Sequence, residues 1–142
     1  MNTIEELEKY LEDENYSFHG LTIGKHFAQE GYMIEKNGIA YEFSYSERGR
    51  KNVIKSFESE KELVEYAYEQ LVENQWNRAH LVACVWSERE IIQAERELEE
   101  LAISFARNDV PNYSEGRRLY RIFVFGKDAA KLTEFKKKYL RK

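Results

Sequence analysis

A chain of 142 residues is long enough to bury a hydrophobic core without disulfides or bound metal. Its single proline and seven glycines argue against low-complexity disorder, and its net charge of −4 argues against a nucleic-acid-binding protein. Cys84 is the only cysteine, which excludes a disulfide framework within the chain and a cysteine metal site. The acidic N-terminal segment lacks the order of a signal peptide, and no apolar run reaches the roughly 18 residues of a membrane span. We therefore expect a cytoplasmic protein that binds neither nucleic acid nor membrane.

The first half of the chain predicts a helix, an antiparallel three-stranded meander and a second helix. A capping box at Thr3–Glu6, followed by apolar residues at helical spacing, predicts a helix over 4–14. Residues 15–29 are poorly patterned, and we expect a loop there. A second capping box begins a helix over 59–74. Between the two helices, alternation predicts strands over 32–36, 39–46 and 53–57.

The strongest local signal is the dipeptide Asn37-Gly38 in front of a strictly alternating run. Both residues tolerate the positive φ angles of a type I′ turn, which predicts a β-hairpin with this dipeptide at its tip. Alternation then places four side chains of the next strand on one face: Ile39, Tyr41, Phe43 and Tyr45. This aromatic face either covers a hydrophobic core or presents a contact surface, and the sequence leaves both open.

The second half predicts alternating strands and helices. The run 79–86 is apolar on both faces, which is typical of a buried strand, although a continuation of the preceding helix competes with this interpretation. A third capping box, at Ser87, favours the strand and begins a helix that extends to about residue 101. A strand, a polar loop, a second strand and a closing helix complete the chain, with the first three at 103–107, 108–117 and 119–125. If the strands 79–86 and 103–107 are neighbours they should pair in parallel, and the hairpin after them should be antiparallel.

The predicted elements follow one another in the order α-βββ-α-β-α-ββ-α. They predict a single α+β domain over 1–142. We expect one mixed, mostly antiparallel sheet with helices packed on it. The sequence shows no domain boundary and no tandem repeat.

No motif assigns a catalytic residue, a cofactor or a metal ligand, and we expect a protein that is not an enzyme. His19, His26 and His80 match no zinc or metalloprotease spacing, although a metal pair or a general base at His19 and His26 stays open. The enzyme alternative is a metal-dependent nuclease or phosphodiesterase that uses Glu42, Glu47 and a histidine. Such a site needs two acids and a lysine at one sheet edge, whereas alternation favours a solvent-facing Glu42.

A third possibility is a nucleic-acid-binding module that combines the basic cluster Lys136–Lys138 with stacked aromatic residues. The net charge weighs against this use, and a solvated helix face is the simpler interpretation. The ten tyrosines also suit a protein interface, because tyrosine offers a large, rigid contact area with a polar tip.

Two parts of the sequence carry a resemblance: AYEFSYSERGR followed by VIKSFESEKELVEYAYEQL, and RNDVPNYSEGRRLYRIFVFGKD. They resemble the small immunity proteins of bacterial polymorphic-toxin systems of the contact-dependent type, from about residue 30 to the C-terminus. Such proteins neutralise a cognate toxin in the cytoplasm of the cell that produces it. The resemblance implies that the partner is a toxin domain and that no cofactor is needed, and it assigns no individual residue.

An acidic domain can bind a basic toxin, often a nuclease, because complementary charge speeds association. We therefore expect the contacts to come from surface acids and from residues of the polar loop. The candidate partner-binding residues are Asp109, Asn112, Tyr113 and Glu115 in that loop, with Glu95 and Glu99 on the acidic face of the preceding helix. The sequence does not predict the oligomeric state.

Overall fold

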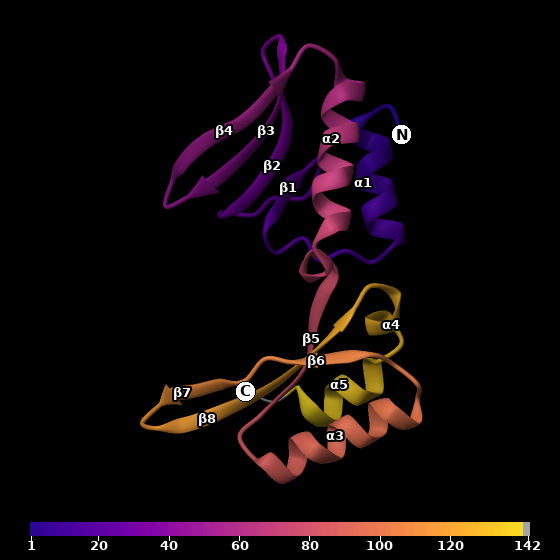
Figure 1. The fold of residues 1–142 in the computed structure, drawn as a ribbon, viewed down its shortest axis with the longest axis vertical. Coiled ribbons are helices and arrows are strands. Elements are labelled where there is room, and N and C mark those ends of the chain that lie inside the picture. The colour runs from indigo at the N-terminus through magenta and orange to yellow at the C-terminus, as the bar shows by residue number, and fades with distance from the viewer. Residues whose placement is uncertain (141–142) are drawn as a thin grey trace. The chain divides into compact units, whose positions relative to one another are not determined.

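The computed structural model describes residues 1–140, and the chain divides into two compact units, Met1–Asn77 and Arg78–Lys142 (Figure 1). Each unit has its own four-stranded sheet, its own helices and its own hydrophobic core. The predicted α+β class is confirmed, but the expectation of one mixed sheet is wrong, because the strands divide between two sheets. A single cooperative domain over 1–142 stays a prediction. Within residues 1–140, no helix is long and apolar enough to cross a lipid bilayer.

The N-terminal unit begins with α1 (Ile4–Asp13), whose capping box is reciprocal: the Thr3 hydroxyl accepts from the Glu6 N–H, and the Glu6 carboxylate accepts from the Thr3 N–H. The remaining elements are β1 (Leu21–Ile23), β2 (Gly31–Asn37), β3 (Ala40–Glu47), β4 (Arg50–Phe57), α2 (Glu60–Glu73) and the 3-10 turn η1 (Gln75–Arg78). The strands lie in the sheet in chain order, with β1 parallel to β2 and the other pairs antiparallel.

Helices α1 and α2 lie side by side over one face of this sheet (Figure 1). Their apolar stripes meet the inner residues of the first three strands in one core, which includes Leu11, Ile23, Ile34, Phe43 and Leu63. Full burial of such side chains stabilises by about 1.5–3 kcal/mol each. Strand β1 corrects the expected loop over 15–29, because three residues are too few to show alternation and the strand is fixed by its pairing with β2.

The first hairpin turns one residue later than predicted. Asn37 pairs with Ala40, so the loop residues are Gly38 and Ile39, and only Gly38 has a positive φ, of 65°. This is the pattern of a type II′ turn rather than type I′. Ile39 is 95% exposed at the tip instead of sharing the aromatic face. A type I′ pattern occurs in the next hairpin, where both residues of Arg48-Gly49 have positive φ.

The aromatic face of β3 is buried at its centre and open towards one end. Phe43 is 2% exposed and packs edge-on against Tyr66 of α2, with ring centroids 5.3 Å apart. Tyr45, two residues further on, is 36% exposed. The register between β3 and β4 shifts after Phe43, and the next residue, Ser44, is buried as well. The core interpretation is therefore confirmed at Phe43, and the contact-surface interpretation stays a prediction for the exposed end of the face.

The C-terminal unit alternates strands and helices along the chain. Its elements are β5 (Ala79–Val85), α3 (Glu88–Glu100), β6 (Phe105–Arg107), β7 (Val110–Ser114), β8 (Arg117–Phe125), α4 (Lys127–Ala130) and α5 (Thr133–Tyr139). Strand β8 is central and pairs antiparallel with β5, β6 and β7. Helices α3 and α5 contribute to a core that includes Val82, Leu98, Ile122, Val124 and Phe135. Cys84 in β5 is buried as well.

Four expectations for this unit meet different outcomes. Strand β8 separates β5 from β6, so these two strands are not neighbours, whereas the antiparallel pairing of the later hairpin is confirmed. The loop expected over 108–117 is wrong, because β7 occupies half of it and turns into β8 through Glu115-Gly116, with φ of 50° and 76°. The closing helix is interrupted near Leu132 and forms the two short helices α4 and α5.

Candidate functional site

Two of the predicted partner-binding residues are joined by Arg107 in the C-terminal unit. The Arg107 guanidinium donates to both carboxylate oxygens of Asp109, at 3.0 and 2.6 Å, and to Glu95 at 3.2 Å. Arg118 donates to the same Asp109 carboxylate at 3.2 and 3.3 Å, and the Arg121 backbone N–H donates at 3.2 Å. The Asp109 side chain is 8% exposed. Asp109 is therefore the centre of an arginine cluster, here called the Asp109 hub, that ties β6, β8 and α3 together.

The hub is ionised throughout the neutral pH range. Burial raises the pKa of the Asp109 carboxyl, but the hydrogen bonds from Arg107 and from the Arg121 N–H outweigh burial and leave the pKa below its ordinary value. The hydrogen bond to Asp109 in turn raises the pKa of Arg107. Bidentate guanidinium–carboxylate pairs are among the strongest charge-assisted hydrogen bonds, so the hub fixes the base of the β7–β8 hairpin.

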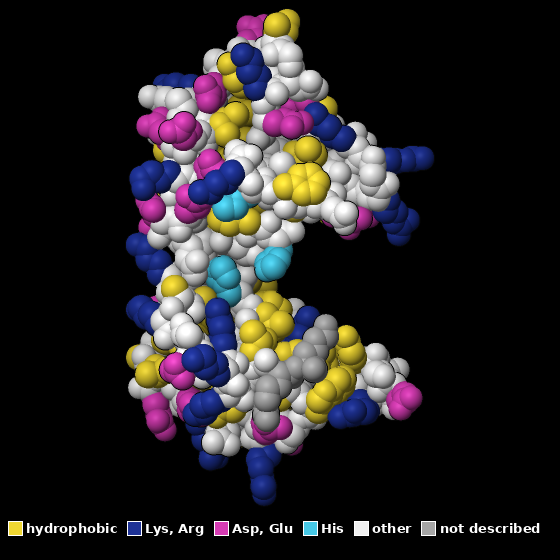
Figure 2. All heavy atoms as spheres, turned by 180° about the vertical axis from the view of Figure 1, so that it is seen from behind, with side chains coloured by type: hydrophobic (Ala, Val, Ile, Leu, Met, Phe, Trp, Pro, Cys, Tyr) yellow, Lys and Arg dark blue, Asp and Glu magenta, His cyan; other side chains and the backbone are white. Residues whose placement is uncertain are grey.

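The remaining loop candidates lie on this hairpin. Asn112, Tyr113 and Glu115 are exposed, Tyr113 by 45%. The Tyr113 ring packs edge-on against the half-buried Trp86, with centroids 5.7 Å apart, and the Arg117 guanidinium lies 4.2 Å from the centroid of the Trp86 ring. In Figure 2, hydrophobic, basic and acidic side chains all reach the surface where the β7–β8 hairpin extends to the right.

Trp86 and Arg117 were not among the predicted contact residues. The sequence assigns Trp86 to the end of a buried strand and Arg117 to a polar loop, and neither position shows a signal of its own. Their contact depends on β8 lying next to β5, which brings together residues 31 positions apart. Only the strand order of the sheet could have predicted it.

The two segments that carry the candidates differ in the sign of their net charge. Residues 107–121 hold four arginines against two acids, which gives +2. Helix α3 holds six glutamates against two arginines, which gives −4, and the candidate Glu99 is exposed on it. The acidic character expected of the contact residues therefore belongs to α3, whereas the hairpin is basic.

Glu42, the acid of the enzyme alternative, lies in a lysine-centred cluster on the N-terminal sheet. Lys51 Nζ is 2.8 Å from Glu42 and 2.6 Å from Glu35, so two acids and a lysine do gather there. The Glu42 side chain is 12% exposed, which corrects the expected solvent-facing position. Hydrogen bonds to Glu35 and Glu42 raise the pKa of Lys51. The Lys51 ammonium is therefore paired with both acids in an ion-pair network, and the enzyme alternative stays a prediction.

Two of the three lysines in the basic cluster Lys136–Lys138 are ion-paired within their own unit. Lys138 Nζ lies 2.8 Å from a carboxylate oxygen of Glu97 on α3, and Lys137 lies 3.2 Å from Glu134. These acids reduce the positive charge that the cluster presents, which weakens the alternative of a nucleic-acid-binding face.

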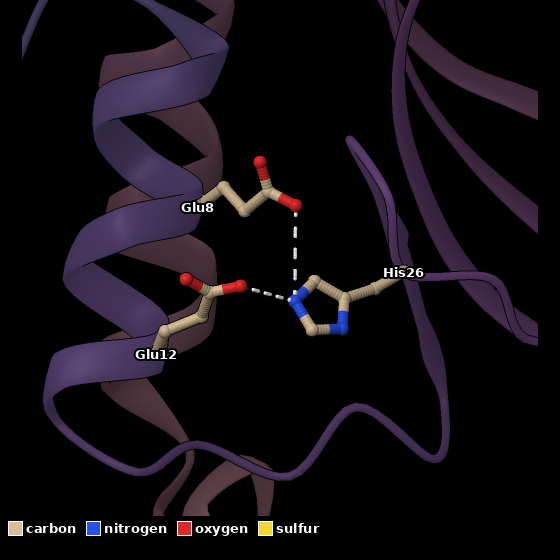
Figure 3. A group of neighbouring side chains, drawn as sticks. All are labelled: Glu8, Glu12 and His26. Carbon is tan, nitrogen blue, oxygen red and sulfur yellow. Dashed lines mark hydrogen bonds and ion pairs between the residues drawn. The ribbon is translucent and has the colours of Figure 1, made fainter.

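A second cluster, in the N-terminal unit, brings together residues that the sequence did not connect (Figure 3). Glu8 and Glu12 lie one turn apart on α1, and both carboxylates point toward the ring of His26 in the loop after β1. His26 Nε2 lies 2.6 Å from Glu12 Oε2 and 3.7 Å from Glu8 Oε2. One potential ligand atom from each residue lies within 4.8 Å of the other two. We call these three residues the Glu8–Glu12–His26 cluster.

Neighbouring groups hold this cluster in place. The Phe18 ring stacks on the His26 ring, with centroids 3.6 Å apart and planes 9° from parallel. The Lys25 backbone N–H donates to Glu8 at 2.9 Å, and the Lys25 ammonium lies 3.3 Å from Glu12. Gly24 has a φ of 56°, and a Cβ at this position would overlap with the Glu8 carboxylate. The hydrogen bond with His26 lowers the pKa of Glu12.

His26, one of the two histidines for which a metal pair or a general base stayed open, forms a group with two glutamates. Among residues 1–140, the group of side chains that could hold a metal ion contains His26 and the two glutamates, and it does not contain His19. The spacing of Glu8 and Glu12 was visible in the sequence, but glutamates four residues apart are common on solvated helix faces. The sequence carried no signal that a loop residue would reach them.

Comparisons of the chain with protein-family models, with curated proteins and with solved structures find no significant match. Its function is therefore inferred from the arrangement of its own residues.

Proposed function

We propose that this chain is an immunity-type inhibitor that binds a cognate toxin domain of a bacterial polymorphic-toxin system and neutralises it in the cytoplasm. The observation that carries this proposal is the β7–β8 hairpin, which presents Asn112, Tyr113 and Glu115 on an exposed and braced scaffold. The segment 107–128, which resembles immunity proteins, contains the same hairpin. A hairpin of this kind suits an inhibitor that covers the site of its target.

The hairpin is ordered before it binds. Main-chain pairing with β8 and the Asp109 hub fix its base, and the contact of Tyr113 with Trp86 fixes its aromatic side. A surface that is already ordered loses less conformational entropy on association, so more of its contact energy appears as affinity. Tyr, Trp and Arg are also the residue types that most often dominate binding energy in interfaces.

The basic hairpin and the acidic helix α3 are assigned different roles in the proposed complex. We assign direct contact to Tyr113, Arg117 and the other exposed hairpin residues, and attraction of a basic target such as a nuclease to the acidic face of α3 with Glu99. Glu95 and Asp109 act through Arg107 as positioning residues, because their carboxylates are already hydrogen-bonded to it.

Co-expression with the toxin domain encoded beside the gene tests the proposal. The full chain should restore growth and co-purify with the toxin. Tyr113→Ala and Trp86→Ala should each weaken the complex at least about tenfold, which corresponds to about 1.4 kcal/mol. The affinity of the purified complex is measured by calorimetry.

Tyr45→Ala is the matched control, because Tyr45 is an aromatic residue of similar exposure on the N-terminal unit. It should leave affinity unchanged. Absence of both growth rescue and complex formation with the wild-type chain would overturn the proposal. Equal losses for Tyr45→Ala and Tyr113→Ala would overturn the assignment of contact to the hairpin.

A further inference from the structure

We propose that the Glu8–Glu12–His26 cluster is a binding site for one divalent transition-metal cation of the zinc class. The site lies wholly within the N-terminal unit and is independent of the proposed toxin contact. Its three side chains come from two segments, α1 and the loop after β1, and their ligand atoms converge on one small volume (Figure 3).

The spacing of the ligand atoms fits a small cation after slight adjustment. Ligand atoms about 2.0–2.1 Å from a tetrahedral zinc ion lie about 3.3 Å from one another. The His26 Nε2 atom is 2.6 Å from one carboxylate oxygen and 3.7 Å from the other, so the two distances bracket that spacing. We expect rotations of the two glutamate side chains to equalise these two distances when a cation binds.

The donor set selects the class of metal. One imidazole nitrogen and two carboxylates suit zinc, manganese or iron(II), whereas magnesium and calcium prefer oxygen ligands alone. The two carboxylates also compensate a double positive charge. Three protein ligands leave a fourth position open, and the side chains are partly exposed, by 15% for Glu8, 23% for His26 and 33% for Glu12. A cation can therefore reach the site from solvent and keep a water molecule as its fourth ligand.

The surrounding residues orient the ligands as the outer shell of a metal site does. Ile23 and His26 exchange backbone hydrogen bonds at 3.0 and 2.9 Å, which closes the loop tightly around Gly24. Phe18 fixes the plane of the His26 ring, and the Lys25 N–H holds one Glu8 oxygen. Such orienting contacts normally strengthen metal binding, because the ligands need little rearrangement.

A metal-free ion-pair cluster is the competing account, in which Lys25 and a protonated His26 neutralise the two glutamates. The two accounts differ in the role of the Lys25 ammonium, which lies 3.3 Å from Glu12. If a cation binds, this ammonium competes with it for the Glu12 carboxylate. Removal of the ammonium should then leave metal affinity unchanged or increase it.

The test is a calorimetric titration of Zn²⁺ into the full chain after treatment with a chelator. We expect one equivalent to bind, and Mg²⁺ at the same concentrations to give no heat of binding. Glu12→Gln and His26→Gln should each weaken zinc binding at least about tenfold, whereas Lys25→Ala should bind at least as tightly as wild type. In parallel, zinc at 100 times its Kd should raise the Tm of the wild-type chain by about 5 °C or more and should leave that of Glu12→Gln nearly unchanged.

His19→Gln is the matched control, since it removes a histidine of the same unit that lies outside the cluster. It should bind zinc as wild type does. Absence of zinc binding to the wild-type chain would overturn the site, and so would equal losses in His19→Gln and His26→Gln. If His26→Gln fails to fold, Glu12→Gln decides the matter, because it keeps the side-chain shape and the helix. A loss in Lys25→Ala as large as that in Glu12→Gln would also count against a cation at this position.

Discussion

The two units of this protein use buried and half-buried charge in opposite ways. In the C-terminal unit, arginines outnumber carboxylates around Asp109, and guanidinium and backbone N–H groups fill both of its oxygens. In the N-terminal unit, two glutamates converge on a single nitrogen of His26 with one lysine beside them. Around Asp109, the rigid N–H donors of the arginines satisfy the carboxylate. Around His26, the carboxylate oxygens outnumber the donor groups that face them.

This difference separates a structural cluster from a candidate site. A guanidinium has several rigid donors and always keeps its charge, so the Asp109 hub can be satisfied without any further ligand. An imidazole nitrogen can exchange its proton for a metal ion, and glutamates can rotate to follow it. A cluster of charged side chains therefore serves stability in one unit and can serve binding in the other.

The largest expected effect tests how separate the two units are. Phe43→Ala removes a buried ring from the N-terminal core and should lower the free energy of unfolding by about 3–5 kcal/mol. Because Phe43 belongs to that core alone, amide protection should fall across β2 and β3 and stay unchanged in β8. Hydrogen exchange followed by NMR measures the free energy of unfolding and the amide protection of each strand.

Tyr45→Ala, on the same strand but 36% exposed, should cost about 1 kcal/mol or less. An equal loss of protection in β8 after Phe43→Ala would show that the two units open together. That result would favour the single domain over 1–142 that the sequence predicts.

A smaller effect is expected when the carboxylate at the centre of the Asp109 hub is removed. Asp109→Asn should lower the free energy of unfolding by about 2 kcal/mol at pH 7, because charged hydrogen bonds to arginine are lost. The pKa of Asp109 is lowered in the folded state, so its stabilisation is present above the unfolded-state value of about 3.9 and is lost as pH falls through the folded-state pKa. The difference between wild type and variant should therefore shrink in acid.

Urea unfolding at pH 7 and at pH 3 measures this difference. Asp128→Asn is the control in the same unit, because the Asp128 side chain is 44% exposed and pairs with the exposed Lys131. It should change stability by less than about 0.5 kcal/mol at either pH. A difference between Asp109→Asn and wild type that stays constant with pH would contradict an ionised hub.

The smallest effect tests the space around Glu8 in the other cluster. Gly24→Ala introduces a side chain at a positive φ and against the Glu8 carboxylate, and should cost about 1–2 kcal/mol. Gly49→Ala, in the turn between β3 and β4, also places a side chain at a positive φ, of 77°, but with no atom within 4 Å of the added Cβ, so it reports the backbone cost alone. Thermal unfolding of both variants should show Gly24→Ala as the less stable. Equal Tm values would mean that Glu8 moves aside freely.

Local signals predicted most of the helices and strands. The Ser59 and Ser87 hydroxyls accept from the N–H groups of Glu62 and Glu90, as the capping pattern required, and α2 and α3 begin there. Such signals act within one turn of helix or within one pair of strands, so a single sequence contains them in full. The type of the first turn was wrong because Asn-Gly and Gly-Ile each offer an acceptable turn, and the pairing of β2 with β3 chose between them.

The candidate sites depend on contacts between distant segments. Glu8 and Glu12 meet His26 only once β1 pairs with β2. Trp86 meets Arg117 only because β8 pairs with β5. The polar loop candidates Asn112, Tyr113 and Glu115 were identified from composition, but their presentation on a β-hairpin was not.

By itself, then, the sequence determined the α+β class, the start of each capped helix and the burial of its apolar stripes, because these follow from interactions between residues a few positions apart. Only the tertiary structure decided that there are two sheets, that β8 lies between β5 and β6, and that the charges form one closed hub and one open cluster. Strand order and side-chain convergence depend on the relative stability of alternative long-range pairings. The energy difference between such pairings is shared among many residues, so no single position in the sequence indicates it.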